Sequence, residues 1–108
     1  MAASRIGCAG WSIHARAAVH FPLDGSHLER YAAVFSAVEI NSSFYPPHRP
    51  RTYARWARET PDGFSFAVKM PRQITHNLKL VDADLLLRKF LDECGALNSK
   101  LGCILIQL

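Results

Sequence analysis

The chain has 108 residues, of which 49% are hydrophobic and 20% are charged, and its formal net charge is +4. This length suits a single domain, 1–108, with a modest core. No segment approaches the ~20 consecutive apolar residues of a membrane helix, and the start MAASRIG lacks the apolar core of a signal peptide. We therefore expect a soluble, cytoplasmic protein without a membrane partner. The charge permits binding to phosphates but does not demand it.

The cysteines and histidines give no sign of a metal site. Cys8, Cys94 and Cys103 lack CxxC spacing and lie in apolar contexts, which predicts reduced, buried thiols. The five histidines form neither an HExxH motif nor the HxE and CxxC pattern of zinc sites. The sequence therefore predicts neither a metal nor another cofactor.

The first third of the chain predicts a strand, a loop and a helix. Residues Arg5–Ala9 are short and apolar and are followed by Gly10, as in a first strand. A loop over 11–25 follows. Ser26 and Glu29 have the spacing of a capping box. The helical face that follows comprises Leu28, Tyr31, Ala32 and Phe35.

The middle of the chain predicts a second strand and a second helix. The strand covers Ala37–Asn41, and the connection after it covers Ser42–Pro50. Pro50 suits the first turn of a helix, where its missing amide has no cost. That helix should bury Tyr53, Trp56 and Ala57 and expose Arg51, Arg55 and Arg58.

The last third predicts two strands and a helix. Turn chemistry at Pro61–Gly63 precedes a strand over Phe64–Met70, and a long loop through Pro71 and His76 follows. Asp84 is the expected cap of a third helix, and Gly102 precedes a final strand over Cys103–Leu108. The buried face of the third helix should comprise Leu87, Phe90, Leu91 and Cys94.

The order β-α-β-α-β-α-β, with continuously apolar strands, predicts an α/β fold whose parallel sheet is covered by helices. Four βα-type units amount to about half of a TIM-like (β/α)8 barrel, which typically has about 250 residues. The chain ends within an apolar strand, and the first and last strands would be open edges. We expect either the N-terminal half of a longer protein, truncated at its fourth strand, or self-association of two copies through these edges.

Polar residues recur near the C-terminal ends of three predicted strands. Glu39 and Asn41 project to one side of their strand, while Lys69 and Gln107 come late in theirs. The smaller, more polar strand faces should line a barrel interior, with these four residues at its mouth. We predict catalytic roles for Lys69, as anion holder or acid–base group, and for Glu39, as general base or hydroxyl acceptor. Asn41 and Gln107 would orient the ligand. The alternative is a structural Glu39–Lys69 ion pair.

The loops add further candidates for ligand binding. Trp11 and Tyr45 follow the first two strands and would stack on the ligand, or would only cover the rim of the barrel. Arg72 suits phosphate, and His76 lies on the loop after the third strand, where a solvated histidine is the alternative.

Four segments together resemble a known family: GCAGWS, AVEINSSFY, FSFAVKMPRQITH and LGCILIQL. In order and spacing they are similar to the YecE-like family, domain of unknown function 72, across essentially the whole chain. The resemblance implies a TIM-type barrel of roughly twice this length. That barrel looks similar to those of sugar-isomerase-like and apurinic-site endonuclease enzymes, which implies a phosphate- or sugar-bearing ligand.

Three functional hypotheses follow. The first is a barrel mouth that binds a small anionic or sugar-like ligand, with or without catalysis. The second is a nucleic-acid-binding module without chemistry, which would depend on Arg49, Arg51, Arg55 and Arg72. The third is an inactive structural half-barrel that self-associates through its edge strands.

Overall fold

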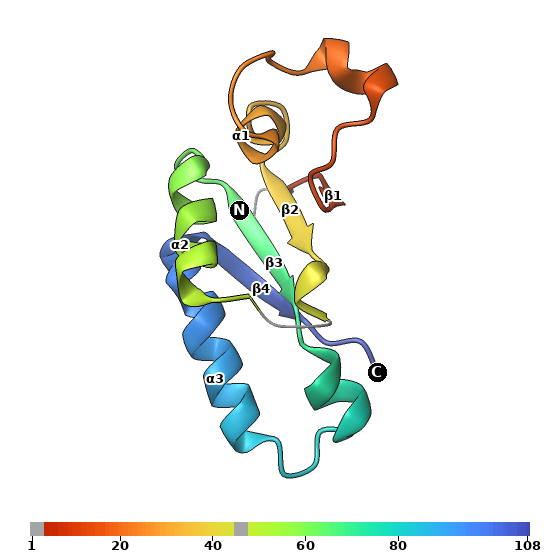
Figure 1. Cartoon of the computed structure of the whole chain (residues 1–108), viewed down its shortest axis with the longest axis vertical. Coiled ribbons are helices and arrows are strands. Elements are labelled where there is room, and N and C mark those ends of the chain that lie inside the picture. The colour runs from red at the N-terminus through yellow and green to blue at the C-terminus, as the bar shows by residue number, and fades with distance from the viewer. Residues whose placement is uncertain (1–3, 45–47) are drawn as a thin grey trace.

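In the part of the chain that the structure describes, four parallel strands form one sheet in the order β1-β2-β3-β4 (Figure 1). The computed structural model describes residues 4–44 and 48–108. The strands are β1 (Gly7–Ala9), β2 (Ala37–Ile40), β3 (Ser65–Lys69) and β4 (Leu101–Leu105), and each pairs in parallel with the next. The predicted α/β class with a parallel sheet, as in part of a TIM-like barrel, is confirmed.

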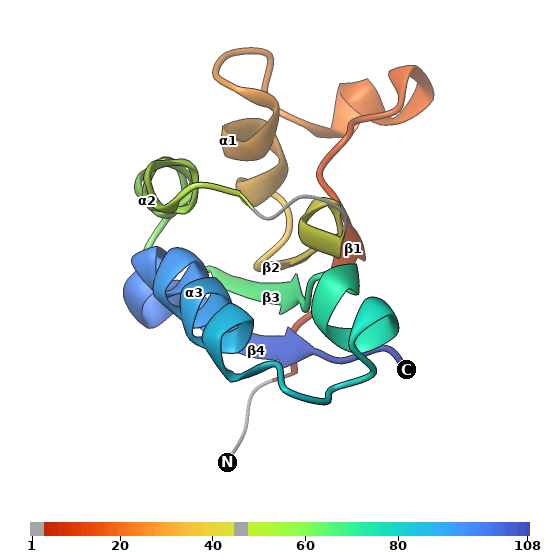
Figure 2. The same ribbon diagram turned by 60° about the horizontal axis from the view of Figure 1, so that its bottom comes forward.

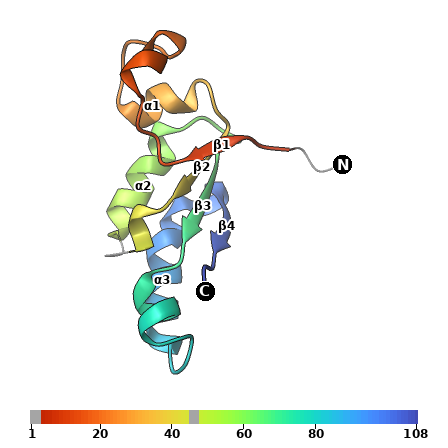
Figure 3. The ribbon, with the colours of Figure 1, turned by 90° about the vertical axis from the view of Figure 1, so that its right-hand side faces the viewer.

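Three α-helices follow one another along one side of this sheet (Figure 2). They are α1 (His27–Ala32), α2 (Pro50–Glu59) and α3 (Asp84–Cys94). The capping box at the start of α1 is present, because the Ser26 hydroxyl accepts from the Glu29 amide and the Glu29 carboxylate accepts from the Ser26 amide. Seen from the side, the helices lie on one face of the sheet, and no helix of the described residues covers the other face (Figure 3).

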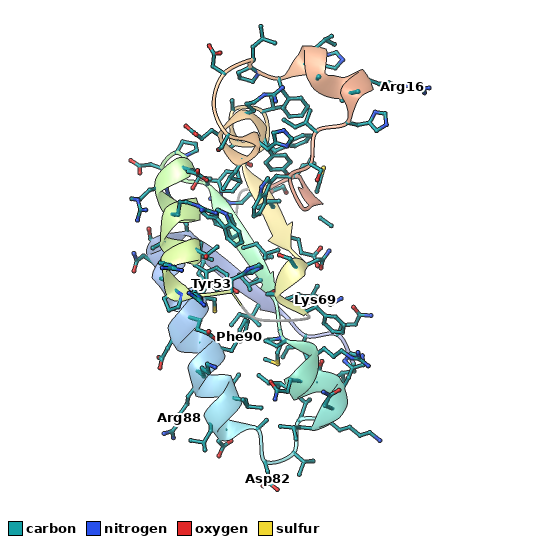
Figure 4. The ribbon with its side chains drawn as sticks, in the orientation of Figure 1. Arg16, Tyr53, Lys69, Asp82, Arg88 and Phe90 are labelled. Carbon is teal, nitrogen blue, oxygen red and sulfur yellow. The ribbon has the colours of Figure 1, made fainter. Side chains whose placement is uncertain are left out.

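Burial alternates along the two central strands. Val38, Ile40, Phe66 and Val68 are at most 3% exposed and face the helices. Tyr53 and Phe90 point from α2 and α3 toward the sheet, whereas Arg88 points away (Figure 4). The bulky apolar residues of β2 and β3 therefore meet the helices, as predicted from the period of two.

The opposite face carries the smaller side chains and borders a cavity of about 410 Å³. We call this space the inner-face cavity. Its lining includes Ala9, Ala37, Glu39, Ser65, Ala67 and Cys103. The assignment of the small and polar residues to an uncovered inner face is thus confirmed.

The predicted bounds of the last strand were wrong. β4 begins at Leu101, so Gly102 lies inside the strand. Phe66 pairs with Leu101 but Ala67 pairs with Cys103, so Gly102 is an extra residue in a bulge. A Cβ at this position would collide with the Ser65 hydroxyl. We expected Gly102 to precede the last strand, whereas inside β4 it permits the bulge and the close approach of β3.

Three other expectations about local structure were also wrong. Ala83 is the N-cap of α3, and Asp84 is the first residue of the helix. Leu91 is 41% exposed, because the face of α3 that carries it has no neighbouring layer in the described residues. Cys8 and Cys103 are exposed thiols, since β1 and β4 are the outer strands of the sheet. Cys94 is buried, as predicted.

In the described residues, four short helical segments occupy connections in which the sequence predicted no helix. The segment after β3 is a single π-helical turn, and the others are 3-10 helices. Such short pieces have no hydrophobic periodicity long enough to detect in the sequence. They are η1 (Ala15–His20), η2 (Ser42–Phe44), η3 (Gln73–Asn77) and η4 (Gly95–Lys100).

The Tyr31 hydroxyl joins α1 to the beginning of the sheet. It donates to the Ala37 carbonyl and accepts from the Cys8 amide, both over 2.7 Å. One side chain therefore satisfies backbone groups of both β1 and β2. The Tyr53 hydroxyl, by contrast, is buried and has no hydrogen-bond partner of ordinary geometry among residues 4–44 and 48–108.

We predict that Tyr31→Phe lowers the free energy of unfolding by about 1–2 kcal/mol, because it leaves two backbone groups unpaired. Chemical denaturation monitored by circular dichroism measures this change. Tyr53→Phe is the matched control and should have a smaller effect. Equal losses in the two variants would contradict the linking role of Tyr31.

Candidate functional site

The C-terminal ends of β2, β3 and β4 lie at one edge of the sheet. Ile40 pairs with Val68, and Lys69 pairs with Leu105, so the residues that follow these pairs leave the sheet side by side. Asn41 comes directly after β2, Lys69 is the last residue of β3, and Gln107 is two residues beyond β4. The direction and register of the strands therefore bring an amide, an ammonium group and a second amide together.

These side chains border an open cavity of about 680 Å³, which we call the basic pocket. It contains five of the residues predicted from the sequence, together with the Phe44 ring. The lining residues are Asn41, Phe44, Lys69, Arg72, His76 and Gln107.

The Ser43 side chain holds the turn after β2 against the end of β3. This side chain is completely buried, and its hydroxyl lies 2.6 Å from the Lys69 carbonyl oxygen and 3.2 Å from that of Ile40. The single hydroxyl proton is therefore shared between the carbonyls that end two neighbouring strands, with the shorter contact to Lys69. The positions of Asn41 and Phe44, on either side of this anchor, are fixed relative to Lys69.

Phe44 places an aromatic ring between two basic groups. The Lys69 ammonium lies over this ring, 4.1 Å from its centroid, in cation–π geometry. The His76 imidazole meets the same ring edge-on at a centroid distance of 5.2 Å, and its Nδ1 lies 2.7 Å from the Thr75 hydroxyl. The ring and the hydroxyl thus limit the orientations of both basic groups.

The chain matches a family of proteins without an established activity. The sequence profile described as "Protein of unknown function DUF72" matches residues 5–108. The chain belongs to the DUF72 family.

Two curated relatives match the chain, and their names state no activity either. The chain is 36% identical over 81 residues to the UPF0759 protein YecE of Escherichia coli K12, a match that covers 75% of this chain and 30% of YecE. It is 35% identical over 72 residues to the UPF0759 protein YunF of Bacillus subtilis 168, covering 65% of this chain and 25% of YunF. The match therefore spans less than a third of either relative.

Solved structures support the same fold. Two crystal structures of a DUF72 family protein from Enterococcus faecalis V583 superpose with TM-scores of 0.74 and 0.67. Each is 22% identical to this chain, and the superposition covers 90% of this chain and 36% of theirs. This likeness concerns the fold and not the chemistry of the site.

Of the other three predicted site residues of this DUF72 chain, Glu39 and Trp11 lie elsewhere. Glu39 faces the inner-face cavity, two positions before Lys69 in the register of the sheet, because its partner on β3 is Ala67. Trp11 packs edge-on against Trp56 at a centroid distance of 4.8 Å and does not border the basic pocket. Tyr45 lies outside the described residues.

The Glu39–Lys69 geometry agrees with a shared sheet face but not with an ion pair. Glu39 on β2 and Lys69 on β3 both project to the face of the sheet away from the helices, as the sequence predicts. In the described part of the chain, however, the Lys69 ammonium is engaged with the Phe44 ring and Glu39 borders the other cavity. The structural ion pair considered as an alternative is therefore not formed.

A second polar contact lies near the pocket and was not predicted from the sequence. The Ser42 hydroxyl lies 2.7 Å from Nε2 of His48. The His48 ring packs edge-on against Tyr53 and Trp56, with centroid distances of 5.7 and 5.0 Å. Burial lowers the pKa of His48 and, more strongly, raises the pKa of Tyr53 to about 12. Ser42 and His48 are six residues apart in the sequence, and this spacing gave no recognisable signal for the contact.

The residues that the structure describes give no support to a metal centre or a membrane span. They include no group of three or more histidine, cysteine, aspartate or glutamate side chains placed to hold a metal ion. None of their helices has the length and apolar character needed to cross a bilayer.

We predict that acid destabilises the chain partly through His48. The unfolded imidazole has a pKa near ~6.5 and the folded one a lower pKa, so below that pH the unfolded state binds more protons. The free energy of unfolding is therefore not reduced by His48 above about pH 6.5, and it decreases as the pH drops toward the folded pKa of this residue. The free energy of unfolding of His48→Phe, which retains a ring, should fall less than that of the wild type between about pH 7 and 5.

Proton NMR of the imidazole in the folded chain provides the direct check. A folded-state pKa at or above about 6.5 would contradict the effect of burial on His48.

Proposed function

We propose that this DUF72 chain binds a small anionic ligand, of the phosphate or sugar-phosphate class, in the basic pocket. The supporting observation is the charge of the lining: Lys69 and Arg72 are cationic, and no aspartate or glutamate is among the lining residues that the structure describes. A hollow lined by charge of one sign attracts ligands of the opposite sign. Its volume lies within the range of ordinary small-molecule sites, about 300–1,000 Å³.

Each lining group has a distinct role in this proposal. Lys69 supplies a point charge, held in place by the Phe44 ring, and the exposed Arg72 supplies a planar fork that suits two phosphate oxygens. The amides of Asn41 and Gln107 donate to, or accept from, hydroxyl groups of the ligand. His76 contributes a further donor or acceptor at the edge of the pocket.

Glu39 and Lys69 remain our candidates for acid–base chemistry if catalysis follows binding. Glu39 lies on the same sheet face as Lys69 but deeper, toward the inner-face cavity. A polyhydroxylated ligand anchored by its phosphate at Lys69 would extend one hydroxyl toward this carboxylate. Glu39 would then accept that hydroxyl or act as general base.

Isothermal titration calorimetry with inorganic phosphate and with a hexose phosphate tests the proposal. Lys69→Ala and Arg72→Ala should each weaken binding at least about tenfold, because each removes a charge-assisted hydrogen bond worth roughly 1.5–3 kcal/mol. Arg55→Ala is the matched control, since this exposed arginine of α2 is not among the pocket residues, and it should bind normally. The uncharged hexose should bind more weakly than its phosphate.

The same samples distinguish the nucleic-acid hypothesis. Binding of a single-stranded oligonucleotide that weakens steeply with salt, and that depends on Arg51 and Arg55 more than on Lys69, would replace the small-ligand proposal. Phosphate affinity that is unchanged in Lys69→Ala and Arg72→Ala would contradict the role of the basic pocket.

A further inference from the structure

The exposed Ser42, two residues after the C-terminal end of β2, is hydrogen-bonded to His48. The Ser42 hydroxyl oxygen lies 2.7 Å from Nε2 of His48, within the range required for proton transfer between a nucleophile and its base. Ser42 is solvent-exposed, so an electrophile can reach it. The neighbouring Ser43 has no such access, because it is fully buried against two carbonyls.

The surroundings of His48 favour the neutral imidazole that a general base requires. Its ring lies edge-on to Tyr53 and Trp56, two buried residues on the inward face of α2. Partial burial lowers its pKa, which favours the uncharged ring, and in the tautomer that carries its proton on Nδ1 the Nε2 atom accepts the serine proton. The aromatic contacts also restrict the ring to a narrow range of orientations.

The Ser42–His48 pair adjoins the basic pocket through the backbone. Ser42 directly follows Asn41 and precedes Phe44 by two residues, and both of those residues line the pocket. The buried hydroxyl of Ser43 fixes this short segment against the end of β3. Ser42 therefore lies on the short segment that contributes Asn41 and Phe44 to the pocket.

We propose that Ser42 is a nucleophile and His48 its general base in acyl transfer from a carboxylic ester that carries an anionic group. The Ser42 oxygen bonds to the carbonyl carbon while its proton passes to Nε2 of His48. The bond to the leaving oxygen breaks, and the departing alcohol takes the proton from His48. Water then attacks the acyl-serine by the reverse proton path and releases the carboxylic acid.

Only the choice of an anionic substrate rests on the proposed function. The reactivity of Ser42 depends on the hydrogen bond to His48 and is tested without using the basic pocket.

An uncharged alkyl fluorophosphonate is a suitable probe, with intact-mass and peptide mass spectrometry of the chain as readout. The Ser42 oxygen should bond to phosphorus with loss of fluoride, giving a single adduct at Ser42. Ser42→Ala should lose this adduct. Ser99→Ala, which removes another exposed serine, should keep it.

The rate of labelling tests the role of the base. His48→Gln should label at least about a hundredfold more slowly, the lower end of the contribution of a general base. Far-UV circular dichroism and tryptophan fluorescence should show that the variant remains folded. Equal rates in the wild type and a folded His48→Gln, or no adduct at Ser42 in the folded wild-type chain, would overturn the inference.

Phosphate titration of the same variants separates the two proposals. Ser42→Ala should bind phosphate like the wild type, because its side chain is not part of the basic pocket. In Lys69→Ala the phosphate affinity should fall. A wild-type chain that binds phosphate but forms no adduct at Ser42 would contradict the nucleophile alone, and one that forms the adduct without binding phosphate would contradict the anion site alone.

Discussion

The buried hydroxyl of Ser43 is the contact on which the geometry of the site depends. It lies within hydrogen-bond distance of the carbonyls of Ile40 and Lys69, which end two parallel strands. Because parallel strands all point the same way, their final residues meet at one edge of the sheet. The hydroxyl fixes how the chain leaves that edge, and it thereby determines where Asn41 and Phe44 lie relative to the Lys69 ammonium.

One face of the sheet supplies the buried core, and the other carries the accessible polar side chains. Bulky side chains such as Phe66 and Val68 are buried beneath the helices and supply the core. The face away from the helices carries small residues, so the Glu39 carboxylate remains partly exposed to solvent. It therefore needs no buried counter-ion. The same alternation that makes the core continuous therefore leaves polar groups accessible near the strand ends, where the basic pocket opens.

Much of this arrangement follows from sequence patterns that act locally. Alternation along β3 assigns Lys69 to the inner face, and the spacing of Ser26 and Glu29 predicts the start of α1. The contacts that complete the site do not follow, because they join side chains from different elements. The Phe44 ring meets Lys69 only after η2 docks against β3. The bulge at Gly102 likewise depends on how β4 approaches β3, which no pattern within β4 reveals.

The central claim is that the strand ends form one anion site. Two-dimensional NMR of the isotope-labelled chain, titrated with inorganic phosphate at constant ionic strength, tests it most directly. We expect saturable shifts with one common dissociation constant at Asn41, Lys69 and His76, with little change along α2. Shifts confined to the arginine-bearing face of α2, or shifts at the strand ends that do not saturate together, would contradict the account.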